Sequence, residues 1–547
     1  MSIPFPVPPA SRPVAMGVNG MVASAHPLAP MAGVRMLMDG GNAFDAAVAT
    51  AASLNVGEPY MSGVGGIGLA LAYVAAEDRV RAPNFSGRAP IGTDPERYTA
   101  TDTDIGIMFA LVPGNVSGWL KLHETYGKLD REKVFAPAIG YAEHGIGVTH
   151  LNSRMMANSA ARLSRFPSAG IILDADGIAP RPGAKLKMPQ LAESLRAIAK
   201  GGADEFYRGE LARRILNGSD ELGGLLTEED LATYEAEWQD PIGIDYRGYR
   251  IHMSPPNSSG FQILQTLKTM EGCSDDNLAF QHPNTRHLFI EAVKLAVTDR
   301  IKFAGDPRCV TAPIDGLLSD GYVAAQRERI NRTGAASVSG EHFASKVAPE
   351  ALIVGNPQEV DGGMTTHFVA ADRDGNVVSI TQTLGGGFGS GLAVGDTGIF
   401  LNNMAYWFDL EEGSPNRIGP DRQVDFVVAP TQAFRNRRFH VSLGTPGSFG
   451  ILQTTPQFVM NFLDFGMNIQ QAIDAPCLRV YEGKRVQMEE RFLAPVRQAL
   501  VELGHEVDVI EPWSMSVGGA QGIHVDPNEG VFQGGADPRR DGYAIGY

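Results

Sequence analysis

Cysteine is scarce in this sequence. Its 547 residues include three cysteines, Cys273, Cys309 and Cys477, which lie far apart and form no CxxC pair. This spacing provides neither a disulfide framework nor a set of metal ligands. So few thiols are typical of a reducing compartment, where cysteines stay free. The glycine-rich stretch 384–391 also lacks the Lys-Ser/Thr of a phosphate loop. We therefore expect no metal and no other cofactor.

Two further absences narrow the class of protein. No basic block offsets the formal net charge of −16, which argues against nucleic acids and anionic membranes as partners. No apolar run is long enough to span a bilayer. The N-terminal sequence MSIPFPVPPASRPVAMG lacks the basic start and apolar stretch of a signal peptide. We therefore expect a soluble cytoplasmic protein.

The composition is that of a globular protein, with 43% hydrophobic and 20% charged residues. The length is large for one core, so the chain forms either one large domain or two closely packed parts. Near the N-terminus the pattern predicts a helix that stops at Gly40-Gly41 and a second helix, rich in alanine, from Ala43 to Leu54 with Asn42 as its cap. A buried strand follows within 63–74, which indicates helices packed on a sheet.

Further along, amphipathic patterns predict helices over 188–202 and 287–303. Residues 333–363 have no such pattern and are expected to form a long exposed connection. Two alternating segments follow, 366–372 and 376–384, separated by a turn. They are typical of a β-hairpin.

Thr365 lies at the open end of this predicted hairpin, separated by Met364 from the flexible Asp361-Gly362-Gly363. If Asp372 and Asn376 bracket a three-residue turn, Thr365 faces Thr383 across the hairpin. A threonine hydroxyl is a poor nucleophile without an adjacent base, and its own α-amine can serve once it is free. That amine exists only if the bond between Met364 and Thr365 is cut. A threonine-rich strand without catalytic role is the alternative interpretation.

Five segments, in this order, resemble the γ-glutamyltranspeptidase family, and together they run nearly from end to end. The segment that begins at Thr365 resembles the start of the small subunit in that family. The five are HPLAPMAGVRMLMDGGNAFDAAVATAASLNVGEPYMSGVGGIG, VPGNVSGWLKLHETYGKL, MSPPNSSGFQILQTL, TTHFVAADRDGN and GGADPRRDGYAIGY.

The resemblance implies an α+β fold, the four-layer αββα sandwich of the N-terminal nucleophile hydrolases, with a helical part in the large subunit. It implies a precursor that cuts itself into residues 1–364 and 365–547, two subunits of one intertwined domain. Thr365 would be the agent of the cut and the catalytic nucleophile, and Thr383 the threonine whose hydroxyl contacts it.

The resemblance also implies an oxyanion hole. Gly447 and Ser448 stand where the family usually has Gly-Gly, and their backbone N–H groups would bind the oxyanion. Serine at the second position keeps the N–H group.

The residues that would bind the substrate depart from the family. Typical members hold the α-amino group of a γ-glutamyl substrate with an asparagine at the position of Gly385. They also use the pattern Asn-Asn-(Gln or Glu)-x-x-Asp-Phe, of which this chain keeps Asn403 but has Met404 and Trp407 at the polar and acidic positions.

The carboxylate-binding residues differ too. A serine pair of the family aligns with Phe426 and Val427, and its arginine matches Arg88 only with a shift of two positions. A site walled by these apolar side chains suits an acyl group without an α-amine, because an unpaired buried ammonium costs several kcal/mol. Arg88 then holds a carboxylate elsewhere on the substrate or forms a structural salt bridge.

We therefore predict a self-processing amidohydrolase or acylase that acts on a small amide through an acyl-enzyme on Thr365. One alternative is a γ-glutamyl transferase or glutathione hydrolase with an altered pocket. The other is an uncut, non-catalytic homologue that acts as a binding protein. A homo-oligomer is compatible with the sequence but not indicated by it.

Overall fold

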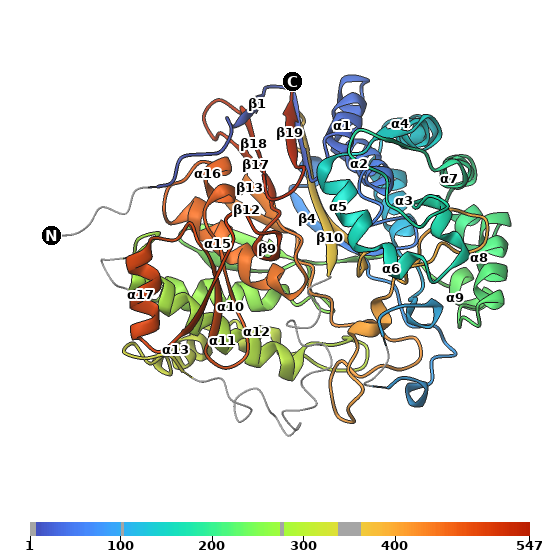
Figure 1. Ribbon diagram of the computed structural model, residues 1–547. Helices are drawn as coiled ribbons and strands as arrows, with labels where there is room; N and C mark the ends of the chain where they lie inside the picture. Colours follow the sequence, from blue (N-terminus) through green and yellow to red (C-terminus); the bar gives the residue numbers. More distant parts are fainter. Residues whose placement is uncertain (1–6, 100–102, 274–277, 337–362) are drawn as a thin grey trace.

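The computed structural model describes residues 7–99, 103–273, 278–336 and 363–547 (Figure 1). The long connection predicted for 333–363 therefore lies almost entirely outside the described residues. In the part of the chain that is described, no helix is both long and apolar enough to cross a membrane.

Two antiparallel seven-stranded sheets form the centre of the molecule. One has the order β1-β18-β17-β13-β12-β9-β8 and the other β19-β2-β10-β11-β3-β4-β7. The two sheets pack face to face, with β2, β10 and β11 against β13, β17 and β18. A three-stranded sheet β14-β15-β16 and a two-stranded sheet β5-β6 lie outside this pair.

The strands of the chain have the following bounds. They are β1 Ala15–Gly17, β2 Gly20–Ser24, β3 Ile67–Val74, β4 Arg79–Phe85, β5 Ile146–Gly147, β6 Lys185–Leu186, β7 Glu237–Gln239, β8 Ile242–Tyr246, β9 Tyr249–Met253, β10 Met364–Asp372, β11 Val377–Gly385, β12 Thr431–Arg435, β13 Arg438–Gly444, β14 Leu478–Val480, β15 Arg485–Glu489, β16 Glu506–Ile510, β17 Gln521–Val525, β18 Phe532–Ala536 and β19 Tyr543–Gly546.

Helices cover the outer face of each large sheet. On the sheet that contains β10 lie α1, α2 and α3, with α4 and α7 outside them, and on the other sheet lie α10, α15 and α16. Figure 1 shows the strands between these two groups of helices. The predicted four-layer αββα sandwich is confirmed, and α3 to α9 supply the predicted helical part before residue 365.

The helices have these bounds. They are α1 Leu28–Met38, α2 Ala43–Gly57, α3 Asn115–Tyr126, α4 Arg131–His144, α5 His150–Asn158, α6 Ala160–Leu163, α7 Pro189–Tyr207, α8 Glu210–Glu221, α9 Glu228–Ala232, α10 Gly260–Glu271, α11 Pro283–Phe303, α12 Ile314–Leu317, α13 Asp320–Glu328, α15 Ile451–Leu463, α16 Ile469–Asp474 and α17 Ala494–Glu502.

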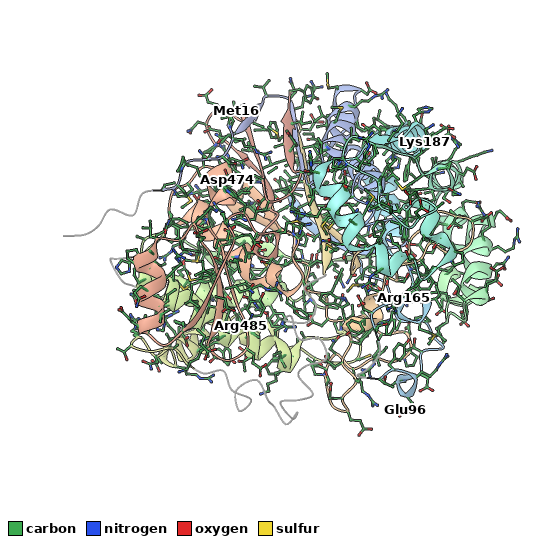
Figure 2. The ribbon with its side chains drawn as sticks, viewed as in Figure 1. Met16, Glu96, Arg165, Lys187, Asp474 and Arg485 are labelled. Carbon is green, nitrogen blue, oxygen red and sulfur yellow. The ribbon has the colours of Figure 1, made fainter. Side chains whose placement is uncertain are left out.

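The alanine-rich α2 is buried along its whole length, as its composition predicts. The Asn42 side chain accepts hydrogen bonds from the amides of Phe44 and Asp45, which caps the helix as expected. Small residues let α1 approach closely, since a Cβ on Gly33 would lie 2.5 Å from the Thr50 hydroxyl oxygen. Between the layers the space is filled by side chains, while charged residues such as Glu96 and Lys187 lie at the periphery (Figure 2).

Both large sheets combine strands from either side of residue 365. β10 pairs with β2 on one side and with β11 on the other, and β11 pairs in turn with β3. The division into residues 1–364 and 365–547 stays a prediction. Such pieces would share each sheet, so a cut before Thr365 leaves them interleaved.

The turn between β10 and β11 is fixed by one buried carboxylate. Asp372 Oδ1 accepts hydrogen bonds from the amides of Asp374 and Asn376, at 2.9 and 3.0 Å. Its Oδ2 accepts from the Ala43 amide at the start of α2, at 2.8 Å, and from the Asn376 side chain at 2.9 Å. The carboxylate therefore ties the hairpin to the first turn of the helix packed beneath it.

We expect Asp372→Ala to lower the free energy of unfolding by about 3 kcal/mol, because it leaves the buried Ala43 amide and the N–H groups of the hairpin turn without this acceptor. The matched control is Asp374→Ala, which removes an exposed ion pair with Lys128 and should cost less than about 1 kcal/mol. Urea unfolding of both variants checks this. Equal losses would mean that Asp372 does not fix the hairpin.

Candidate active site

Thr365 and Thr383 face each other across β10 and β11, as the sequence predicts. Both are buried, and the Thr365 hydroxyl donates to Thr383 Oγ1 at 3.3 Å. The regular pairing shifts by one residue between Met364 and Thr365, so Met364 lies opposite Gly385. The irregularity falls on the peptide bond that is predicted to be cut.

The Thr383 hydroxyl also contacts that peptide bond. It donates to the Met364 carbonyl oxygen at 2.5 Å and accepts from the Gly385 amide at 2.8 Å. One hydroxyl thus links the nucleophile oxygen of Thr365 to the carbonyl that this oxygen would attack. A donor on a carbonyl oxygen stabilises the negative charge that develops there during attack.

Gly447 and Ser448 lie in the loop between β13 and α15. Gly447 has φ 139° and Ser448 has φ 57°, and a short 3-10 turn, Ser448–Gly450, leads directly into α15. Neither amide donates a hydrogen bond to a described residue. Free amides at the start of a helical segment form a site for negative charge, which is what an oxyanion hole requires. The oxyanion role itself stays a prediction.

His367 packs against Gly444, the last residue of β13 before this loop. Its Nδ1 is 2.8 Å from the Thr381 hydroxyl oxygen, and a Cβ on Gly444 would lie 2.2 Å from its ring. Complete burial lowers the pKa of His367 to about 3, so the imidazole is neutral. Its hydroxyl partner is Thr381 and not Thr365, which makes His367 a packing residue beneath the start of the loop.

The opposite face of β10 carries a carboxyl group. Thr366 donates from its hydroxyl to Glu58 Oε2 at 2.9 Å, and Glu58 is the residue that follows α2. Burial raises the pKa of Glu58 to about 7, against the opposing effect of the Arg540 guanidinium. This contact anchors the residue next to the nucleophile to the helix layer.

The four apolar residues predicted to line the substrate site belong to one hydrophobic cluster. The four are Met404, Trp407, Phe426 and Val427, and all are buried. Phe449, which directly follows Ser448, belongs to the same cluster and was not predicted from the sequence.

Two contacts connect this cluster to the catalytic residues. The Trp407 ring stacks on the Phe449 ring, with 5.2 Å between centroids and 29° between planes. The Met404 sulfur lies 3.0 Å from where a Cβ on Gly385 would stand. The apolar surface therefore reaches both the Ser448 loop and the end of β11.

Gly385 has φ 99°, a conformation that side chains rarely adopt, and a Cβ there would lie 2.1 Å from Asn403 Oδ1. An asparagine at position 385 therefore does not fit this backbone. Asn403 itself is engaged, since its Oδ1 accepts from the Gly386 amide and its Nδ2 donates to the Asp104 carbonyl, both at 2.8 Å. Asn403 orders the loop after β11.

Two charged pairs lie around the apolar residues, and neither was predicted from the sequence. Asp104 pairs with Arg162 beside Gly386, and both side chains are partly exposed. Arg300 pairs with Asp425 at 2.7 Å, and its guanidinium lies 4.7 Å from the Phe449 ring centroid. Aspartate and arginine are frequent in surface pairs, so nothing in the sequence distinguishes these four residues.

Arg88 lies among other partners. It pairs with Asp421 at 3.1 Å, donates to the Thr233 carbonyl at 3.3 Å and stacks over the Tyr234 ring. These contacts are those of the structural salt bridge that the sequence analysis considered. No contact joins Arg88 to Thr365 or Thr383 in the described part of the chain, and its role toward a substrate carboxylate stays a prediction.

Among the described residues, one group of side chains has the composition of a metal site, namely His287, Glu291 and His505. Its atoms are engaged with one another and with a lysine. His287 Nδ1 lies 2.8 Å from His505 Nε2, and Lys294 donates to Glu291 Oε1 at 2.8 Å. The lysine already neutralises the carboxylate, so we assign this group a structural role.

Comparison with known proteins shows the family of this chain. A family model described as Gamma-glutamyltranspeptidase matches residues 29–547. The Acylase ACY 1 proenzyme of Pseudomonas sp. (strain SE83) is 35% identical over 569 residues, which cover 100% of this chain and 97% of the relative. The Glutathione hydrolase-like YwrD proenzyme of Bacillus subtilis (strain 168) is 35% identical over 541 residues, covering 97% and 99%.

Among solved structures, cephalosporin acylase from Bacillus halodurans matches with a TM-score of 0.89 and 35% identity, covering 100% of this chain and 99% of that one. A gamma-glutamyltranspeptidase from Helicobacter pylori matches with a TM-score of 0.55 and 28% identity over 62% of this chain. With a family model over nearly the whole chain and relatives alike along almost their full lengths, this protein belongs to the gamma-glutamyltranspeptidase family and is an amide-bond hydrolase of the N-terminal nucleophile type.

Proposed function

We propose that the chain cuts itself before Thr365 and then hydrolyses amides whose acyl group carries no free α-amine. The observation that carries the second part is the hydrophobic cluster that contains Met404, Trp407, Phe426 and Val427. In this cluster Met404 lies beside Gly385, and Trp407 stacks on Phe449, which follows Ser448. Both relatives described above are named proenzymes, and one is named an acylase, which supports both parts.

Self-cleavage begins when Thr365 Oγ1 attacks the Met364 carbonyl carbon. The C–O bond forms as the C–N bond to the Thr365 nitrogen breaks, and that nitrogen receives the hydroxyl proton. The Thr383 hydroxyl, 2.5 Å from the Met364 oxygen, stabilises the negative charge of the tetrahedral intermediate. Water then hydrolyses the ester, which releases the Met364 carboxylate and leaves Thr365 with a free α-amine.

In turnover, the α-amine is the general base for its own hydroxyl. Thr365 Oγ1 attacks the substrate carbonyl, and the Gly447 and Ser448 amides bind the oxyanion. The leaving amine takes the proton, and an acyl ester remains on Thr365. Water attacks this ester through the same oxyanion and releases the acid, so each cycle consumes one water and restores the threonine.

The selectivity follows from the cost of burying charge. The ammonium of a γ-glutamyl group needs polar partners once it leaves water, and each charge-assisted hydrogen bond contributes roughly 1.5–3 kcal/mol. Methionine, tryptophan, phenylalanine and valine side chains offer no carboxylate or carbonyl oxygen to accept from an ammonium. An uncharged acyl chain incurs no such cost and gains from contact with these side chains.

A γ-glutamyl substrate is the second candidate, and one observation favours it. The Asp104 carboxylate lies beside Gly386 and its side chain is partly exposed, so it is a potential partner for an ammonium. The Asp104 carboxylate is already neutralised by Arg162, so it attracts a substrate ammonium less strongly. We therefore rank this candidate second.

We also propose a reducing compartment for the protein. The three cysteines form no disulfide, and Cys273 and Cys477 are buried. Burial raises the pKa of the Cys477 thiol to about 12, so this thiol stays protonated and unreactive.

Processing is the first prediction. The purified protein should give two pieces on a denaturing gel, and N-terminal sequencing of the smaller piece should read TTHFVAAD. Thr365→Ala should remain one chain, because it has no hydroxyl to attack the Met364 carbonyl. A different N-terminus, or a cut in Thr365→Ala, would contradict the assignment of the nucleophile.

Selectivity is the second prediction. The specificity constant for an uncharged acyl p-nitroanilide should exceed that for γ-glutamyl p-nitroanilide by about a hundredfold, since two charge-assisted hydrogen bonds are lost. The double variant Met404→Gln with Trp407→Asp should move this ratio toward the γ-glutamyl substrate. A wild-type ratio in favour of γ-glutamyl p-nitroanilide or glutathione would place the second candidate first.

The third prediction concerns Thr383. Thr383→Val keeps the shape of the side chain but removes the donor on the Met364 carbonyl, and it should slow self-cleavage by about a hundredfold. Thr383→Ser keeps a hydroxyl and is the control, with a rate within about tenfold of the wild type. The measurement is the half-life of the precursor after rapid purification, and a wild-type half-life in Thr383→Val would make the hydrogen bond irrelevant to the cut.

A further inference from the structure

The side chain of Ser448 has a hydroxyl that nothing in the described structure uses. Ser448 is 4% exposed, and its Oγ has no hydrogen-bond partner among the described residues. The oxyanion role predicted for this residue uses its backbone N–H group and would be served equally by glycine. Glycine would also adopt the φ of 57° at lower cost. The buried, unpartnered hydroxyl therefore needs an explanation of its own.

The hydroxyl lies against the segment that precedes the bond to be cut. A Cβ placed on Gly363 would be 2.5 Å from Ser448 Cβ and 2.9 Å from Ser448 Oγ. Gly363 is two residues before Thr365, so Ser448 touches the chain on the acyl side of the Met364 carbonyl. In the precursor, a side chain at position 363 would therefore collide with Ser448.

In the proposed mechanism, the same space receives the substrate after processing. During self-cleavage the Met364 carbonyl forms an ester with Thr365 Oγ1, and during turnover the substrate acyl carbon forms the same ester. In the precursor, the chain atoms of Met364 and Gly363 thus occupy the place that the substrate acyl chain takes during turnover. Counted from the acyl carbon as the first atom, the Gly363 Cα is the fifth atom of that chain.

We infer that the Ser448 hydroxyl is a specificity-determining donor, which binds a hydrogen-bond acceptor carried by the fifth atom of the substrate acyl chain. An oxygen at the Cβ position of Gly363, moved slightly away from the serine methylene, lies within hydrogen-bond reach of Oγ. This inference rests on the proposed function, because it assigns a contact to the acyl group that the enzyme transfers to water.

The contact with Gly363 is tested first, in the precursor and without any substrate. Gly363→Ala should slow self-cleavage at least tenfold, since its methyl group collides with Ser448 and displaces the Met364 carbonyl. In a Ser448→Gly background, which keeps the amide and removes the side chain, the same change should cost less than about twofold. An equal cost in both backgrounds would show that the two residues do not touch and would overturn the inference.

The donor role is tested with two p-nitroanilides of equal size. One carries a ketone oxygen on the fifth carbon of its acyl chain and the other a methyl group there. Processed wild-type enzyme should prefer the ketone by about tenfold in specificity constant, as one neutral hydrogen bond predicts. In Ser448→Ala the ratio should fall to about one. We compare the ratio of the two specificity constants because any change in the oxyanion contact of the residue 448 amide affects both substrates alike and cancels in the ratio.

Each remaining outcome is decisive. An unchanged ratio in Ser448→Ala, or equal wild-type rates on the two anilides, overturns the donor role while leaving the proposed hydrolase intact. If processed wild-type enzyme cleaves neither anilide nor a shorter acyl p-nitroanilide, the proposed function fails, and the inferred acyl contact fails with it.

Discussion

The hydrogen-bonded chain from Thr365 through Thr383 to the Met364 carbonyl depends on one register, the pairing of β10 with β11. A slip of one residue would turn every side chain of β10 to the other face of the sheet and separate the two hydroxyls. The register is held at the turn by Asp372 and along the strand by the neighbours β2 and β3. A strand held on both sides can be cut at its first residue and stay in place.

The surroundings of the nucleophile are polar but almost free of charge. Among the described residues, no carboxylate or imidazole contacts the Thr365 hydroxyl. His367 is neutral and bonded to Thr381, and Glu58 lies on the opposite face of β10 with Thr366. Among the described residues, the Thr365 hydroxyl therefore has no side-chain base beside it. This supports the proposal that the α-amine freed by self-cleavage is the general base.

The proposed selectivity depends on the backbone as well as on side chains. The glycine at 385 permits a left-handed turn, and Asn403 fills the space where a larger residue would stand. The change from asparagine to glycine is thus linked to the path of the whole loop after β11. The charged groups nearby, Asp104 with Arg162 and Arg300 with Asp425, are each paired already. A charged substrate group would have to compete with these pairs.

The sequence by itself determined the parts that depend on local pattern. Alternation and turn residues located the β10–β11 hairpin and put Thr365 opposite Thr383, and the Gly-Gly stop and Asn42 cap located α1 and α2. The five segments, in their order along the chain, resemble the gamma-glutamyltranspeptidase family, and that resemblance implied the αββα sandwich.

Only the tertiary structure decided which distant residues meet. The stacking of Trp407 on Phe449, the contact of Ser448 with Gly363 and the partners of Arg88 join segments that no periodicity connects. Arg88 is an example. The sequence left two roles open for it, a substrate contact or a salt bridge, because its partner Asp421 lies far along the chain. Local pattern reflects hydrogen bonding and burial within one element, whereas such contacts arise from how whole layers pack.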